Sequence, residues 1–583
     1  MATEESSSGL DVTISETVQS LLESYRRMQM PMGQYVTFIL VPSAAFFLLS
    51  VLAALLLDLP MIIRLPIPLL GALALFAATF YPKILLAQRR TQLNNRFHLL
   101  VTHMTVLSTT NIDRMEVFRT LAKEEEYGEL ANEMHRIVQL VDTWNQSLDD
   151  ACRRRAKEVP SDAVADFLDR LAYTIGAGQS LDDYLITEQK QIIQNYSTVY
   201  ESALDSLEVM KDLYLSMILS MTFALVFAVV LPILTGTNPT LTVSAVIVMF
   251  VFVQSGFFLA IRSMAPYDPL WYHPDERHGA FQDRLRKSTI AGVALSAILL
   301  FISLGGIFQF SPVGLAAFVP FFGKPLPLAL YAVVPVTPLL IPGIVIRHEE
   351  QSVKSRDGEF PSFIRALGAT EGAKQSTTSQ VLKSLRKKDF GPLTAKVDDL
   401  YKRLNMRIEP ADAWRWFTAD CRSYLIQTFS EMYLIGREMG GSPKMLGELI
   451  GENMNEVLQL RQQRKQATTT MIGLLYGITA ASTFAFFIGL QVVNILSNMS
   501  LDLSSSGAFD AGQLIHTGVY DIPLIEFLLV VVIMFSAMLS ALMIRTIDGG
   551  HKMNTYIHFV AMAWIAAIIS IVTKMLVGTF LAI

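Results

Sequence analysis

Cysteine and charged residues are both scarce in this sequence of 583 residues. It contains only Cys152 and Cys421, with no Cys-x-x-Cys or Cys/His cluster, so neither a disulfide framework nor a zinc site is expected. Charged residues make up 17%, and the net charge of −5 is divided among many segments, which gives no sign of nucleic-acid binding. Hydrophobic residues make up 52%, with a mean hydropathy of +0.40. This composition is typical of an integral membrane protein.

Catalytic motifs are also missing. There is no Gly-x4-Gly-Lys-[Ser/Thr] phosphate loop, and the Gly-rich segment 368–375 has the wrong spacing and no Ser or Thr directly after its lysine. The Gly-x-Gly-Asp setting of a membrane peptidase is absent, and Gln254-Ser255-Gly256 does not fit a nucleophile elbow. His98 and His103 are five residues apart, which does not match a helical metal pair, so we interpret them as core or surface histidines. The sequence therefore predicts no enzyme activity, cofactor or metal site.

Nine apolar segments are each long enough to cross a bilayer, which requires roughly 20 mostly apolar residues. A backbone in lipid must satisfy its own hydrogen bonds, so these spans should be helices. They cover 35–57, 65–86, 213–235, 241–262, 288–309, 326–346, 469–495, 522–544 and 556–580. We therefore expect an all-α polytopic membrane protein.

Two polar stretches interrupt the spans, and both show apolar residues at helical spacing, as at Phe97, Leu100, Met104 and Leu107. We expect each stretch to form a helical bundle. The predicted division is an N-terminal segment with an amphipathic helix over 12–28 (1–34), spans 1–2 (35–86), a first helical domain (87–212), spans 3–6 (213–346), a second helical domain (347–468) and spans 7–9 (469–583).

Positive charge predicts the orientation, because Lys and Arg are concentrated on the cytoplasmic side of a membrane. The stretches 87–212 and 347–468 carry 14 and 20 Lys/Arg, whereas the connections 236–240 and 496–521 carry none. The bias alternates through all nine spans. It predicts a cytoplasmic N-terminus, two cytoplasmic domains and an exterior C-terminus in the cell membrane. Asn498-Met-Ser500 is a glycosylation sequon in a predicted exterior loop.

A secondary transporter or channel is the alternative from another class, and ionisable or broken helices in the bilayer would favour it. Intramembrane ionisable residues are few: Glu526, His558 and Lys574. The sixth span contains a cluster of prolines that should bend or break it. These are Pro325, Pro327, Pro335, Pro338 and Pro342. No matching broken helix occurs in the other half, and no charge accompanies the broken sixth span, which counts against a transport site.

The two polar stretches resemble each other, which indicates a duplicated module. Segment 117–124 aligns with 381–388, and Tyr-Thr-Ile-Gly at 173–176 aligns with Tyr-Leu-Ile-Gly at 433–436. In both copies a Gly-containing turn follows, and another long helix then leads into a span. In the second copy this helix covers 453–468 and enters the seventh span directly.

The segment Phe-Pro-Ser-Phe-Ile-Arg-Ala-Leu at 360–367 and the less well preserved Arg-Phe-His-Leu-Leu at 96–100 enter these helical domains. Together with the duplication and topology, they make the chain resemble the type II secretion F-domain family, in particular its large archaeal members with two copies. The resemblance covers residues from about 35 to 545. It implies a filament-assembly platform with no catalytic activity.

The resemblance also implies partners. A cytoplasmic hexameric ATPase and associated motor proteins would act on the platform, which would contact filament subunits and form a homodimer. The favoured reading is a platform of the archaeal motility filament, the archaellum. A platform of an adhesive type IV pilus remains the alternative within the class.

Three basic clusters on the polar stretches are candidate docking sites for an acidic surface of the ATPase, because charge steers association. They are Arg153, Arg154, Arg155 and Lys157; Lys383, Arg386, Lys387 and Lys388; and Arg461, Arg464 and Lys465. A solvated face or a surface held to anionic lipid is the simpler interpretation of each cluster.

Overall fold

The computed structural model describes residues 32–56, 66–110, 112–272, 280–308, 326–374, 378–505 and 521–581. Over these ranges the chain consists of helices and their connections, with one isolated β-bridge between Trp271 and Ser423. The predicted amphipathic helix over 12–28, Pro325 and the side chain of Asn498 lie outside the described residues. The prediction of an all-α protein is confirmed.

The chain divides into two compact units. The first comprises Met1–Ile193 with Glu438–Gly441, and the second comprises Gln194–Arg437 with Ser442–Ile583. The helices of the first unit are α2 (Met32–Tyr35), η1 (Val36–Leu40), α3 (Val41–Leu56), α5 (Pro66–Asn95), α6 (Phe97–Ser108), α7 (Arg114–Lys123), η2 (Glu125–Tyr127), α8 (Glu129–Asp142), α9 (Leu148–Glu158), α10 (Asp162–Gly176) and the start of α11 (Leu181–Val230).

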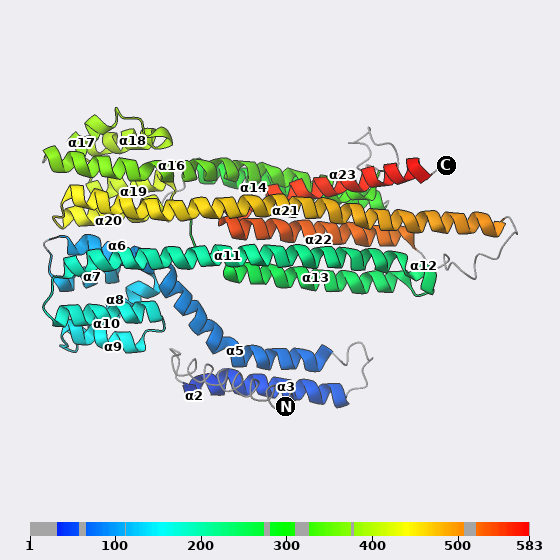
Figure 1. Ribbon diagram of the computed structural model, residues 1–583, viewed down its shortest axis with the longest axis horizontal. Coiled ribbons are helices and arrows are strands. Elements are labelled where there is room, and N and C mark those ends of the chain that lie inside the picture. Colours follow the sequence, from blue (N-terminus) through cyan, green and yellow to red (C-terminus); the bar gives the residue numbers. More distant parts are fainter. Residues whose placement is uncertain are drawn as a thin grey trace, which may run out of the picture. The chain divides into compact units, whose positions relative to one another are not determined.

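The second unit begins within α11, at Gln194, and contains most of the long helices (Figure 1). Its elements after α11 are α12 (Pro232–Thr235), α13 (Pro239–Met264), α14 (Ala280–Phe308), α15 (Leu328–Val333), η5 (Val334–Leu339), α16 (Leu340–Lys374), α17 (Thr378–Leu385), η6 (Gly391–Leu393), α18 (Thr394–Asn405), α19 (Pro410–Cys421), α20 (Tyr424–Glu438), α21 (Pro443–Ser505), α22 (Ile522–Asp548), η9 (Lys552–Asn554) and α23 (Thr555–Leu581).

Eight helices of the described residues are long and apolar enough to cross a membrane. They overlap eight of the nine predicted spans, and the other prediction, 65–86, overlaps α5. The chain is therefore a multi-pass membrane protein. Glu526 and Lys574, two of the predicted intramembrane charges, form an ion pair between α22 and α23, which gives both a structural role.

The first polar stretch folds around side chains from α6 to α10. Leu100, Met104 and Phe118 are completely buried, as the helical spacing predicted, and so is Phe167 of α10. Serine N-caps begin two of these helices: the Ser147 hydroxyl accepts a hydrogen bond from the amide of Asp150 at the start of α9, and Ser161 caps α10 in the same way. The two polar stretches also share their helix order, since α7 to α11 follow one another as α17 to α21 do.

Helix α21 is continuous over 63 residues, from the second polar stretch into the seventh predicted span (Figure 1). It packs along α16, where glycines allow the two backbones to meet. A Cβ atom at Gly447 would lie 2.8 Å from the carbonyl oxygen of Ile364, and a Cβ atom at Gly368 would collide with the carbonyl oxygen of Pro443. The sequence predicted the continuity of α21 but not this close crossing.

The proline-rich sixth span breaks as predicted. Its helix changes from α15 to the 3-10 segment η5, which contains Pro335 and Pro338, and then to α16. Two hydroxyl groups of α14 donate hydrogen bonds to carbonyl groups of this region: Ser296 to Pro335 at 2.6 Å and Ser303 to Tyr331 at 2.6 Å. These bonds compensate for backbone partners that proline cannot supply.

Candidate functional site

The first predicted basic cluster lies on α9, and its members point to different sides of that helix. Arg153, Arg154 and Lys157 are exposed, whereas Arg155 is buried with Ala151 and Cys152, four and three residues before it. Residues at this spacing share one helix face. Only three of the four predicted cations therefore form a solvent-accessible surface.

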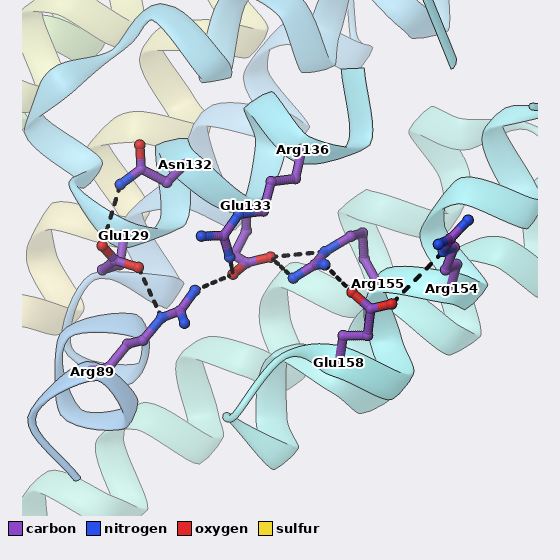
Figure 2. Close-up of polar contacts among 8 residues, drawn as sticks. All are labelled: Arg89, Glu129, Asn132, Glu133, Arg136, Arg154, Arg155 and Glu158. Carbon is purple, nitrogen blue, oxygen red and sulfur yellow. Dashed lines mark hydrogen bonds and ion pairs between the residues drawn. The ribbon is translucent and has the colours of Figure 1, made fainter. Parts of the chain in front are cut away.

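Arg155 belongs to an ion network around Glu133, shown in Figure 2. The Glu133 carboxylate is completely buried and accepts hydrogen bonds from Arg155 at 2.7 Å, Arg136 at 2.6 Å and Arg89 at 2.9 Å. Arg89 lies on α5, which overlaps the second predicted span, so the network joins this helix to α8 and α9. A buried carboxylate requires such partners. Arg155 thus holds the first unit together.

The second predicted cluster is exposed throughout. Lys383 lies in α17, and Arg386, Lys387 and Lys388 lie in the turn that follows. Arg386 is positioned by Asp398 at 3.7 Å and by the ring of Tyr401, whose centroid is 4.8 Å away. The ring and carboxylate hold one cation of this turn, and the neighbouring lysines stay accessible to a partner.

The third predicted cluster is divided between a buried network and the surface. Arg461 donates to both carboxylate oxygens of Asp268, at 2.8 and 2.6 Å, and to Asp357 at 2.8 Å. Asp268 follows α13, Asp357 lies in α16 and Arg461 lies in α21, so one guanidinium connects three parts of the second unit. The Asp357 side chain is completely buried.

Arg464 caps the end of α22. Its guanidinium donates to the carbonyl groups of Ile547 at 2.5 Å and Thr546 at 3.2 Å. These carbonyls lie in the last turn of that helix, where no further helical amide is available to them. A cation is also favoured there by the helix dipole. Lys465, the next residue, is exposed.

A second ion group ties α16 to the turn between α22 and α23. Lys354 lies 3.1 Å from Glu350 and 3.2 Å from Asp548, and Glu350 accepts a hydrogen bond from the amide of His551. We call the two groups together the junction network. Its members are Asp268, Glu350, Lys354, Asp357, Arg461, Arg464 and Asp548.

The junction network lines a cavity of about 490 Å³ within the second unit. Arg347, Lys465 and His558 share this lining with apolar side chains such as Ile472 and Ile544. Arg347 lies at the end of the sixth predicted span and Lys465 just before the seventh. The cavity therefore lies where apolar helix segments give way to polar ones.

The cysteines and the histidines His98 and His103 are buried, and burial favours the uncharged form of both cysteines and of His103. Burial raises the pKa of the Cys152 and Cys421 thiols to about 12, so both stay protonated at neutral pH. Burial lowers the pKa of His103 to about 3, and its Nδ1 lies 3.0 Å from the Tyr127 hydroxyl. His98 is buried too, which agrees with a core role for both histidines. Among the described residues, no group of three or more potential metal ligands is clustered.

Sequence reasoning missed the acidic half of the junction network. Asp268 and Arg461 are separated by 193 residues, and Asp357 and Arg461 by 104. No local pattern relates them. The one available signal was the position of Arg461 in a helix that continues into a span, since a cation near such a position needs a partner.

Comparison with known proteins gives two relatives of nearly full length. The chain is 34% identical over 520 residues to flagella accessory protein J of Methanocaldococcus jannaschii, which covers 88% of this chain and 90% of the relative. It is 32% identical over 525 residues to flagella accessory protein J of Methanococcus voltae, which covers 89% and 91%. The family model described as type II secretion system protein F matches residues 100–230. No solved structure matches the chain significantly.

Proposed function

The chain belongs to the flagella accessory protein J family, and from this membership we propose that it is the membrane platform on which a cytoplasmic ATPase drives assembly and rotation of an archaellum. The names of both relatives support a motility filament over an adhesive pilus. The proposed platform contacts filament subunits, forms a homodimer and performs no catalysis of its own.

One observation carries the coupling part of this proposal. Helix α21 runs unbroken over 63 residues, a length of about 95 Å, from the second polar stretch into a span. Where it meets the predicted membrane surface, the junction network binds it to α16, to the segment after α13 and to the end of α22. A displacement of the polar stretch would therefore move several membrane helices together.

The proposed ATPase contacts are the exposed cations of the first two clusters. Both polar stretches are cytoplasmic under the positive-inside rule, so these cations face the compartment that holds ATP. They are Arg153, Arg154 and Lys157 on α9, and Lys383, Arg386, Lys387 and Lys388 in and after α17. Arg155, Arg461 and Arg464 are engaged inside the protein and are assigned to its stability instead.

Charge reversal tests the docking. We expect Lys387→Glu combined with Lys388→Glu to abolish co-purification of the ATPase with the full-length protein from membranes, because the two changes replace attraction by repulsion. Arg386 is left in place because its contacts to Asp398 and Tyr401 hold the turn. Membrane insertion and the yield of folded protein should not change.

Arg415→Glu combined with Lys444→Glu is the matched control, because both side chains are exposed on the same polar stretch and the charge change is the same. This control should keep the ATPase. Equal recovery of the ATPase with both variants would remove the second cluster from the proposed interface, and Arg153→Glu with Arg154→Glu would then test the first.

A further inference from the structure

The charges around the junction cavity do not balance one another. Asp268 and Asp357 share Arg461, while Glu350 and Asp548 share Lys354. Arg464 is bound to backbone carbonyl groups, not to a carboxylate. With two carboxylates for each of Arg461 and Lys354, these two groups are each negative by one unit.

Arg347 and Lys465 are the remaining cations of the same lining. Among the described residues, neither has a carboxylate within 4 Å, and the guanidinium of Arg347 instead lies 3.5 Å from the Nε2 atom of His558. Arg464, Arg347 and Lys465 therefore have no dedicated carboxylate, and against the two surplus negative charges they leave the cavity lining with one net positive charge. An anion placed beside Arg347 and Lys465 would balance this net charge.

The rest of the lining specifies what kind of anion fits. Ile472 and Ile544 belong to apolar helix segments, so the cavity has an apolar wall beside its charged one. Its volume of about 490 Å³ is in the range of small-ligand sites. Basic pockets between membrane helices on the side of the positive charges are suited to anionic headgroups.

We propose that this cavity binds the phosphate of an anionic phospholipid, with Arg347 and Lys465 as its direct partners and Arg464 as a nearby fixed charge. The glycerol and the start of the hydrocarbon chains lie against the apolar wall. A bound lipid would fill the space between α16, α21 and the α22–α23 turn, and would fix the spacing of these helices where the polar stretch enters the membrane. The site does not depend on which filament the protein serves.

Native mass spectrometry of the detergent-purified full-length protein tests the site. Phosphatidylglycerol, phosphatidylcholine and inorganic phosphate are added separately, and the single-lipid adduct is titrated. We expect a saturable phosphatidylglycerol adduct that phosphatidylcholine does not reproduce. Arg347→Gln combined with Lys465→Gln should weaken it about a hundredfold, because each charge-assisted contact contributes on the order of tenfold.

Arg286→Gln combined with Lys287→Gln is the matched control. Both side chains are exposed at the polar end of α14 and do not line the cavity, and the same charge is removed next to another apolar span. The control should keep the adduct within about twofold of the unmodified protein. If the double cavity variant is not monodisperse, Lys465→Gln alone, at an exposed position, gives the same comparison with about a tenfold effect.

Three results would overturn the lipid assignment. Equal weakening in the cavity and control variants would mean general attraction of lipid to basic residues. Displacement of phosphatidylglycerol by millimolar inorganic phosphate, with phosphate bound on its own, would identify a site for free phosphate. An unchanged lipid adduct together with loss of ATPase co-purification in the cavity variant would show that a carboxylate of the ATPase occupies the cavity instead.

Discussion

Replacing Arg461 by glutamine tests the junction network most severely, because a single guanidinium serves two carboxylates there. It donates to Asp268 in a bidentate arrangement, to Asp357, and to the carbonyl of Pro269 at 3.0 Å. The side chains of Arg461, Asp268 and Asp357 are only 14%, 9% and 0% exposed. The variant would remove the guanidinium that both of these buried carboxylates share.

The magnitude follows from that burial. Removing one partner of a buried ion pair costs about 3–5 kcal/mol, because the other charge stays behind uncompensated. Asp268 leads directly into the short β-bridge, where the amide of Tyr272 donates to Arg422 at 3.0 Å and the amide of Tyr424 donates to Leu270 at 3.1 Å. We therefore expect this bridge to open far more often in the variant.

Hydrogen–deuterium exchange of the full-length protein in detergent measures the opening at these two amides. A local cost of about 3–5 kcal/mol corresponds to exchange that is at least a hundredfold faster, since every 1.4 kcal/mol is about tenfold. Amides of α10, in the other unit, should be unaffected and provide the internal reference.

Arg415→Gln is the matched control, because it removes the same side chain from an exposed pair with Asp412, whose side chains are 56% and 42% exposed. It should change stability by no more than about 0.5 kcal/mol. Exchange at Tyr272 that changes less than threefold in the Arg461 variant, or equally in both variants, would refute the idea that Arg461 holds the junction closed.

Two further predictions concern individual buried positions. Burial lowers the pKa of His103 from 6.5 to about 3, so the unfolded chain takes up the proton first as the pH falls. The free energy of unfolding therefore decreases below pH 6.5, by about 2 kcal/mol at pH 5. In thermal unfolding at pH 7 and pH 5, His103→Gln should remove this part of the pH dependence, whereas His135→Gln, at an exposed position, should leave it unchanged. Gly368→Ala should destabilise the protein by about 1–3 kcal/mol, because the new Cβ atom would collide with the backbone of α21. Gly358→Ala, in the same helix but with open space around it, should instead stabilise the protein by about 0.5–1 kcal/mol. Equal melting temperatures for the two alanine variants would contradict the close crossing.

The membrane architecture could be predicted because its signals are local. An apolar segment of span length is visible without knowing its neighbours, and eight such segments coincide with long helices of the structure. The break in the sixth span follows from the chemistry of Pro335 and Pro338 alone. The continuity of α21 was also visible, since no Gly/Pro turn separates its polar and apolar parts.

The roles of the basic residues could not be assigned in the same way. Arg154 and Arg155 are adjacent in sequence, but one is exposed and the other is buried against Glu133, because successive positions of a helix face different directions. The aligned tyrosines of the two copies differ similarly. Tyr173 is 72% exposed, whereas Tyr433 is 2% exposed and donates a hydrogen bond to Glu371 of α16. Such differences arise from tertiary packing, which single-sequence patterns do not contain.

Electron microscopy of a strain that lacks this protein, scored together with swimming in soft agar, tests the proposed platform function most directly. The account predicts loss of motility filaments and of swimming, with adhesive pili intact and both losses restored by the unmodified gene. Normal filaments and normal swimming in the deletion strain would contradict it, and loss of pili with normal swimming would assign the protein to the pilus.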